Sequence, residues 1–225
     1  MNFNNYKFRA SSLPNLLIDG RSKDGSLSET TKSFLREIFI QETYGREHFV
    51  VTKYMRKGTM CESDSLDLVE EALGQTYFKN KEKLENEFIT GTPDVIEKPK
   101  IIIDIKTSWD IWTFAAVDEE KARKDYYGQL LGYMWLTNVK ESRLHYCLVN
   151  TPEALIEQEL YKLTMSGVIS ESPEDQDKAR ISYLFDDIPV KDRVKTYDFK
   201  FDDEIHQKLI EKIKLSREYL NTLTL

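Results

Sequence analysis

The segments Gly91-Thr-Pro-Asp94 and Lys100-Ile-Ile-Ile-Asp-Ile-Lys106 are the most informative part of this 225-residue sequence. Side chains alternate between the two faces of a strand, so Asp104 and Lys106 would share one face while isoleucines fill the other. A run this rich in isoleucine is typical of a central strand that is covered on both faces. A carboxylate there is costly unless it is paired or bound to a metal. Asp104 is therefore either half of an ion pair with Lys106 or a metal ligand.

Asp94 lies just before this strand, and the turn residues around Pro99 predict a hairpin between residues 93–96 and 101–106. A loop of three or five residues would place Asp94 opposite Ile102 or Asp104, on the acidic face, whereas a four-residue loop would place it on the other face. Carboxylates that converge beside a lysine suit a hard divalent cation. Taken alone, Asp94 also fits an ordinary turn-forming aspartate after a proline.

Two predicted helices supply the other candidate residues. A helix over residues 58–73 would place Glu62 in line with leucine and valine side chains, at the buried end of an apolar stripe. A helix over residues 118–138 would place Gln129 and Tyr133 on the same side, because they are four residues apart. Seen alone, this second pair is better explained as a core tyrosine with a glutamine at its boundary.

Helices and short strands alternate along the chain, which predicts an α/β or α+β fold rather than a helix bundle or a β-sandwich. Further helices are expected at residues 28–44 and 203–220 and strands at 143–150 and 194–201, after a polar, turn-rich start at 1–25. We expect one domain, residues 1–225, made of an N-terminal helical segment (1–57), a core (58–151), an insertion (152–192) of two helices around an acidic loop at 166–177, and a C-terminal strand and helix (193–225).

The charge balance is acidic, with 32 Lys and Arg against 39 Asp and Glu, so contact with nucleic acid would need a local basic patch. Two basic clusters lie close to the candidate helices: Lys53, Arg56 and Lys57, and Lys121, Arg123 and Lys124. Each is either a DNA-contacting rim or a solvated helix end. Similarly, Trp109, Trp112 and Phe114 either stack on unpaired bases or fill the core.

Several classes of protein are excluded. Two cysteines and three scattered histidines cannot form a disulfide framework, a cysteine-based zinc site or an iron–sulfur cluster. The longest apolar run is a few residues and the start of the chain lacks a signal-peptide pattern, so we expect no membrane partner. The expected location is the cytoplasm, that of the bacterial host if a phage encodes the protein.

Together the motifs Gly58-x-x-x-Glu62, Gly91-x-Pro-Asp94, Asp104-x-Lys106 and Gln129-x-x-x-Tyr133 resemble, in order and spacing, the PD-(D/E)XK nuclease superfamily. More narrowly, they are similar to its RecB-like branch and to the lambda-type phage exonucleases, the viral recombinase family. The Ala10-Ser11-Ser12 start is similar to the serine-containing N-terminal segment of that family. The resemblance covers most of the chain except about 152–192.

The resemblance implies a restriction-endonuclease-like core, with a mixed central β-sheet flanked by helices. It implies Mg²⁺ or Mn²⁺ held by Glu62, Asp94, Asp104 and the backbone carbonyl of Ile105. Lys106 would then position or deprotonate the attacking water, and Gln129 and Tyr133 would contact phosphate or support the metal ligands. Whether one or two metals bind stays open.

The activity implied is that of a metal-dependent DNA exonuclease that acts at duplex ends in phage-type recombination or DNA processing. A single-strand annealing protein and further copies of the chain are the partners expected besides DNA. Two alternatives are a structure-specific or restriction-type endonuclease with the same site, and a catalytically silent DNA-binding module. The intact acid–acid–lysine set argues against the silent module, and the cysteine count excludes an iron–sulfur CRISPR-adaptation nuclease.

Overall fold

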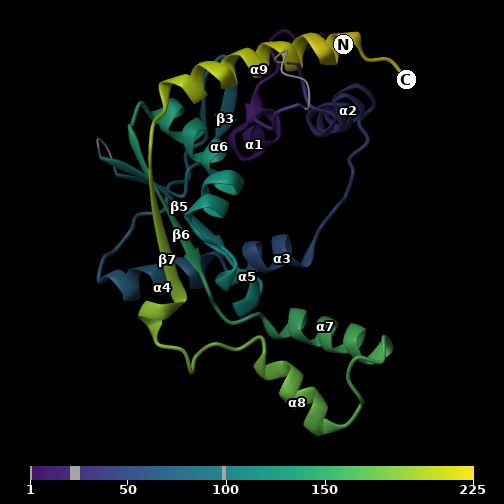
Figure 1. Ribbon diagram of the computed structural model, residues 1–225, viewed down its shortest axis with the longest axis vertical. Helices are drawn as coiled ribbons and strands as arrows, with labels where there is room; N and C mark the ends of the chain where they lie inside the picture. Colours follow the sequence, from purple (N-terminus) through teal and green to yellow (C-terminus); the bar gives the residue numbers. More distant parts are fainter. Residues whose placement is uncertain (1, 21–25, 98–99) are drawn as a thin grey trace.

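A four-stranded mixed sheet forms the centre of the protein, which a computed structural model describes over residues 2–20, 26–97 and 100–225. The strands lie in the order β4 (Val95–Glu97), β5 (Ile101–Thr107), β6 (Glu141–Cys147) and β7 (Val194–Lys200). The β5–β6 pair is parallel and the two outer pairs are antiparallel. Helices cover both faces, so the predicted α/β class with a mixed central sheet is confirmed (Figure 1).

The parallel β5–β6 connection runs through α5 (Ile111–Ala115) and the long helix α6 (Glu119–Thr137), as a crossover between parallel strands requires. Asp118 caps the start of α6 by accepting a hydrogen bond from the Lys121 backbone, and Asn138 ends it in the left-handed conformation. Ile102 packs in the core on the α6 side of the sheet, whereas Ile103 packs with Val69 of α4 (Glu62–Leu73) on the other side. The alternation predicted for β5 is therefore confirmed, with a separate core on each face.

Residues 3–16 contribute Phe3, Phe8, Ala10, Leu13 and Leu16 to the core, which differs from the expected turn-rich start. Strand β1 (Phe8–Arg9) joins β3 (Ile89–Gly91) in parallel, and β3 joins β2 (Leu84–Glu85), in a second small sheet. The 3₁₀ turn η1 (Ala10–Ser12) and α1 (Leu13–Leu16) then pack on α6. The two segments approach so closely that a Cβ at Gly132 would lie 2.6 Å from Leu13 Cδ1. Glycine on α6 thus lets the N-terminal segment reach the helix that carries Gln129 and Tyr133.

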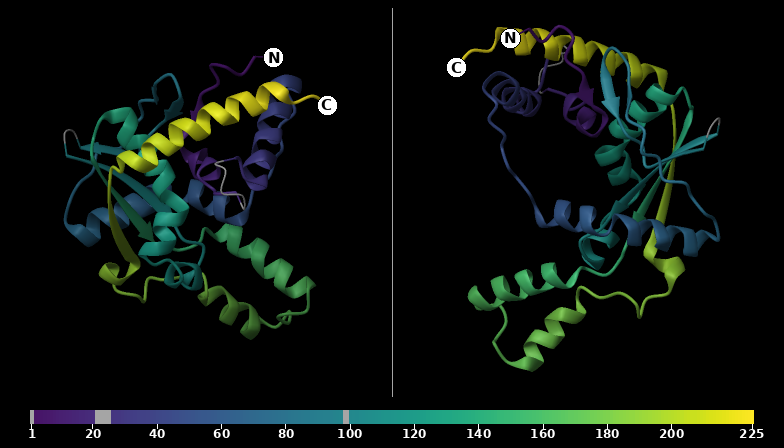
Figure 2. Two further views of the ribbon diagram at one scale, coloured as in Figure 1. Left: turned by 45° about the horizontal axis from the view of Figure 1, so that its top comes forward. Right: turned by 180° about the vertical axis from the view of Figure 1, so that it is seen from behind.

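The remaining helices agree with the sequence in part. Helices α2 (Glu29–Tyr44) and α9 (Asp203–Thr222) form where expected and pack against each other, near both chain ends (Figures 1 and 2). The prediction of a single helix over 58–73 is wrong, because two helices meet there. Helix α3 (Lys53–Met60) ends just before Cys61, and α4 begins just after it. The strand predicted at 143–150 lies at Glu141–Cys147.

The segment after β6 forms a helical hairpin that projects from the body (Figures 1 and 2). Its helices are α7 (Glu153–Met165) and α8 (Pro173–Ile181), followed by the 3₁₀ turn η2 (Val190–Arg193). The acidic loop is shorter than expected because α8 already begins at Pro173, with Ser172 as its cap. In the described ranges no helix is long and apolar enough to cross a membrane.

Candidate active site

The β4–β5 hairpin brings Asp94 to the acidic face of β5. Val95 pairs with Ile103 and Glu97 with Ile101, so the shortest of the loops considered, three residues, is the one that forms. Asp94 lies one residue before this register begins, and its Oδ2 accepts a hydrogen bond from the Ile105 backbone at 2.8 Å. The side chain is thus fixed beside Asp104 by the strand that carries Asp104.

Asp104 is at the centre of a buried polar network, with an exposed fraction of 1%. Its Oδ1 accepts a hydrogen bond from Gln129 Nε2 at 3.1 Å, and the same amide donates to the Tyr133 hydroxyl at 2.9 Å. Its Oδ2 lies 2.6 Å from Lys106 Nζ, but beyond this ion pair it has no hydrogen-bond partner among the described residues. The Gln129–Tyr133 pair therefore contacts the acidic face of β5 rather than only filling the core.

The electrostatics of this network reflect two carboxylates that share one lysine. Burial and the neighbouring Asp104 carboxylate raise the pKa of Asp94 to about 7. Burial alone would lower the pKa of Lys106, but the carboxylates of Asp104 and Asp94 outweigh it and leave that pKa raised. Burial, with the Asp104 charge, raises the pKa of Tyr133 to about 12. A site in which acids repel one another favours an added cation.

Glu62 does not lie at the buried end of an apolar stripe, so that prediction is wrong. Its side chain is 54% exposed in the first turn of α4, and its Oε1 lies 2.7 Å from Lys79 Nζ. The buried face of α4 is turned away from that stripe: Ser65, Leu68 and Val69 are buried, whereas of the leucines in line with Glu62, Leu66 is half-buried and Leu73 is exposed. Glu62 still borders a small pocket of about 80 Å³ that Asp94 and Ile105 also line.

These residues fit a divalent cation by donor chemistry, though not yet as a closed set of ligands. Within the described ranges no three Asp, Glu, His or Cys side chains converge into a metal centre as they stand. Asp94 and Asp104 come together, while Glu62 forms an ion pair with Lys79. Carboxylate and carbonyl oxygens are nevertheless the donors that Mg²⁺ prefers, and this ion usually keeps several waters, so two carboxylates suffice to hold it.

The basic residues of the cluster on α3 make contacts with other parts of the protein. Lys57 is fully buried and donates to the Trp109 carbonyl at 2.8 Å, so the prediction that it contacts DNA is contradicted by its burial. Lys53 pairs with Glu159 of α7 at 2.8 Å, and Arg56 donates to the neighbouring Gln158. These contacts fasten the projecting hairpin to the body. Contact between DNA and Lys53 or Arg56 stays a prediction.

The second cluster lies at the surface of α6. Lys121 pairs with Asp125 within the helix, Arg123 stacks 4.4 Å from the centre of the Tyr127 ring, and Lys124 is exposed. Contact between DNA and these residues stays a prediction. Among the aromatic residues after Lys106, Trp109 and Phe114 are buried in the core, whereas Trp112 is 78% exposed.

A basic pocket beside the network was missed by the sequence analysis. It has a volume of about 420 Å³ and adjoins Tyr133; the side chains that line it include Arg9, Ser11, Lys83 and Thr92. Thr92 and Ser11 lie in motifs already noted, but Arg9 and Lys83 come together only through the pairing of β1 and β2 with β3. The glycine spacing Gly128-x-x-x-Gly132 is a sequence signal that the N-terminal segment packs closely on α6.

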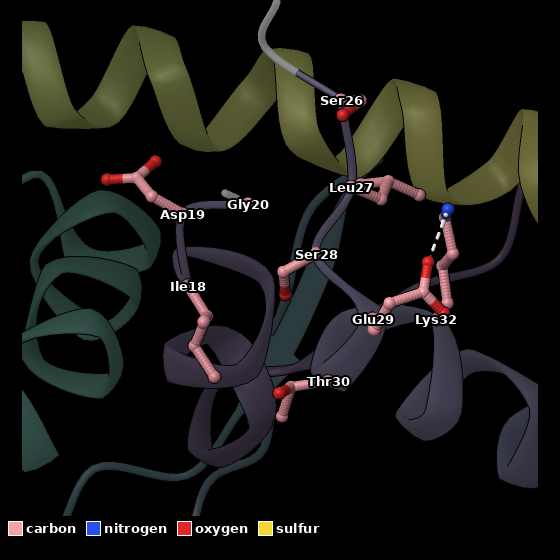
Figure 3. A pocket seen from close by; sticks show the side chains of 9 residues that line it. All are labelled: Ile18, Asp19, Gly20, Ser26, Leu27, Ser28, Glu29, Thr30 and Lys32. Carbon is pink, nitrogen blue, oxygen red and sulfur yellow. Dashed lines mark hydrogen bonds and ion pairs between the residues drawn. The ribbon is translucent and has the colours of Figure 1, made fainter. Parts of the chain in front are cut away.

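A larger pocket, of about 620 Å³, lies away from this network (Figure 3). Residues 18–20 and 26–30 and Lys32 line it, and its polar groups serve the local fold: Glu29 pairs with Lys32, and Ser28 caps α2. We therefore assign the chemistry to the acidic face of β5.

Comparison with solved structures finds the same architecture. A phage-related exonuclease from Haemophilus somnus 129PT matches with a TM-score of 0.78 and 30% identity, over 96% of this chain and 94% of that chain. An alkaline exonuclease from Laribacter hongkongensis matches with a TM-score of 0.63, over 97% and 89% of the two chains, and its complex with dAMP with a TM-score of 0.62. At 13% identity these last two show the fold alone. The sequence matches no family model and no curated protein.

Proposed function

The chain belongs to the lambda-type phage exonuclease family of the PD-(D/E)XK nuclease superfamily, and from this we propose that it is a metal-dependent exonuclease that hydrolyses phosphodiester bonds at duplex DNA ends. The observation that carries the proposal is the meeting of Asp94, Asp104 and Lys106 on one face of the β4–β5 hairpin. The exonuclease from H. somnus, alike over nearly the whole of both chains, supports the reaction class.

We assign the metal to this face. Asp94 and Asp104 would hold Mg²⁺ or Mn²⁺ with the Ile105 carbonyl, and Glu62 would complete the set from across the small pocket. The buried Oδ2 of Asp104, whose only polar partner in the part of the chain described is Lys106, supports this assignment. When bound, such an ion polarises the scissile phosphate and lowers the pKa of a bound water.

The protein's own groups then have separate tasks. Lys106, which the neighbouring acids keep charged, would orient the attacking water, and its charge would offset that on the phosphoryl oxygens. Gln129 holds Oδ1 of Asp104, which leaves Oδ2 directed to Lys106 and the reacting groups. Tyr133 accepts a hydrogen bond from Gln129, so it fixes the orientation of that amide, and its own hydroxyl can donate to a phosphate.

DNA would approach along the basic pocket that adjoins Tyr133. Arg9 and Lys83 supply positive charge, and Ser11 and Thr92 supply hydroxyl groups, which together suit a backbone phosphate. The surface cluster on α6 extends positive charge along the same helix that carries Gln129. A role in phage-type recombination, an annealing protein as partner, assembly with further copies and a cytoplasmic location are proposals that rest on the family.

The test is degradation of an end-labelled linear duplex beside a covalently closed circle, with Mg²⁺ and with EDTA. We expect loss of the linear DNA only, only with Mg²⁺, and no loss with Asp104→Asn, which keeps the shape of the side chain but removes its charge. Cutting of the circle would support an endonuclease instead. If the wild-type protein cleaves neither substrate, a DNA-binding module becomes the better description.

A further inference from the structure

Lys79 belongs to none of the motifs, yet it stands at the same small pocket as Glu62 and Asp94. Its Nζ lies 2.7 Å from Glu62 Oε1, so the Glu62 carboxylate already has a cation beside it. Lys106 has the corresponding position beside Asp104. In the absence of a divalent ion, a lysine therefore neutralises a carboxylate on each side of the site.

The position of Lys79 is set by its backbone. It forms an antiparallel bridge with Val95, and the next residue, Asn80, donates its backbone N–H to the Asp94 carbonyl at 2.7 Å. The Asn80 side chain also donates to the Pro93 carbonyl at 3.0 Å. On the other side, Tyr77 is buried in the core beneath α4. Lys79 is thus held between two anchors, against the segment that carries Asp94.

This arrangement has a consequence for cation binding. A divalent ion and the Lys79 ammonium would compete for the Glu62 carboxylate, and the two like charges would repel each other across a pocket of about 80 Å³. The pair is roughly half exposed, so solvent weakens the repulsion without removing it.

We propose that Lys79 is a positioning residue that holds Glu62 away from the metal site and sets how much divalent metal the protein requires. The inference rests on the proposed metal-dependent function. Removing the charge of Lys79 would release Glu62 and tighten cation binding by about three- to tenfold, the range expected for one half-exposed charge that acts on a divalent ion.

The experiment measures Mn²⁺ binding to the full-length protein without DNA, from the electron paramagnetic resonance signal of free Mn²⁺ at constant ionic strength. We expect tighter binding for Lys79→Met and Lys79→Gln, and binding close to the wild-type value for Lys79→Arg, which keeps the charge. Lys81→Met is the matched control, because it makes the same change in net charge at an exposed position two residues away. Asp94→Asn serves to identify the Mn²⁺ that binds in this pocket: the binding that the wild type shows and this variant lacks is assigned to the pocket.

Three other outcomes separate the inference from the proposed function. If wild type binds Mn²⁺ through Asp94 and both Lys79→Met and Lys79→Gln bind it equally tightly, the role of Lys79 is wrong and the metal site stands. The same holds if Lys81→Met tightens binding as much as Lys79→Met. If neither wild type nor the Lys79 variants bind Mn²⁺ in a way that depends on Asp94, the proposed metal site fails and this inference fails with it.

Discussion

Lys106 and Lys57, one partly buried and one fully buried, have different roles in two regions of this protein. Lys106 on β5 lies 2.6 Å from the Asp104 carboxylate, and the nearby acids raise its pKa. Lys57 on α3 is fully buried between the rings of Trp109 and Phe185, and its hydrogen bond is to the neutral Trp109 carbonyl. Burial lowers the pKa of Lys57 to about 8.

The difference lies in what surrounds each ammonium rather than in how deep it lies. A lysine beside carboxylates is a charged group that can act on a substrate, because the acids offset its desolvation. A lysine beside a carbonyl is an anchor that the fold must stabilise, because a neutral dipole offsets less of that cost. The comparison predicts that a change at Lys106 affects chemistry, whereas a change at Lys57 affects stability and its dependence on pH.

The largest expected effect tests the catalytic half of this comparison. Lys106→Met should lower the rate of linear-duplex degradation by about 10²- to 10³-fold, because the charge that offsets the phosphoryl oxygens is lost. Single-turnover degradation of an end-labelled duplex measures the rate, and circular dichroism at rising temperature checks that the variant is folded. A folded variant with the wild-type rate would show that Lys106 is only a structural partner of Asp104.

The next effect tests the structural half, through the pKa of Lys57. Between pH 8 and pH 10.5 the unfolded chain keeps a proton that the folded protein has lost, so the unfolding free energy of the wild type rises with pH in this window. From pH 7.5 to pH 9.5 the wild type should gain about 2 kcal/mol relative to Lys57→Met. Urea unfolding of both proteins at both values of pH gives this difference. An equal stability gap at both would mean that the folded protein holds Lys57 charged throughout.

Some of the site could be predicted because it depends on local rules. The alternation along β5 fixes which side chains share a face, and a spacing of four residues fixes that Gln129 and Tyr133 share a side of a helix. The register of the β4–β5 hairpin depends only on the length of the turn that joins the two strands. These predictions hold because each involves residues close in sequence and a periodicity that the backbone imposes.

The rest could not be predicted because it depends on which face of a helix is packed and on distant contacts. The burial assigned to Glu62 followed from the leucines and the valine in line with it, but α4 packs on the sheet through Ser65, Leu68 and Val69. Lys57 is indistinguishable in sequence from its basic neighbours Lys53 and Arg56 until α3 is placed against Trp109. Only the Gly128-x-x-x-Gly132 spacing hinted at the close packing of residues 10–16 on α6.

A smaller effect would sharpen the comparison within the site itself. Gln129→Ala removes the amide that holds Asp104 Oδ1 and the Tyr133 hydroxyl, so Asp104 would keep Lys106 but lose its fixed orientation. We expect about tenfold slower degradation, the effect typical of a group that supports a metal ligand. The Mg²⁺ dependence of the rate measures it: a shift to higher Mg²⁺ supports a role in holding Asp104, and an unchanged rate contradicts it.

The smallest effect extends the comparison to the two basic clusters. Lys124→Met on the exposed side of α6 should weaken DNA binding about two- to threefold at moderate salt and lower the salt dependence by about one counterion, because one phosphate contact is lost. Lys53→Met should weaken DNA binding less than Lys124→Met does and cost at most about 1 kcal/mol of stability, because the Lys53 ammonium is already paired with Glu159, which also pairs with Lys162. Titration of a labelled duplex at several salt concentrations separates the two variants. An equal loss of salt dependence in both would mean that Lys53 leaves Glu159 to contact DNA, and that α3, like α6, faces the duplex.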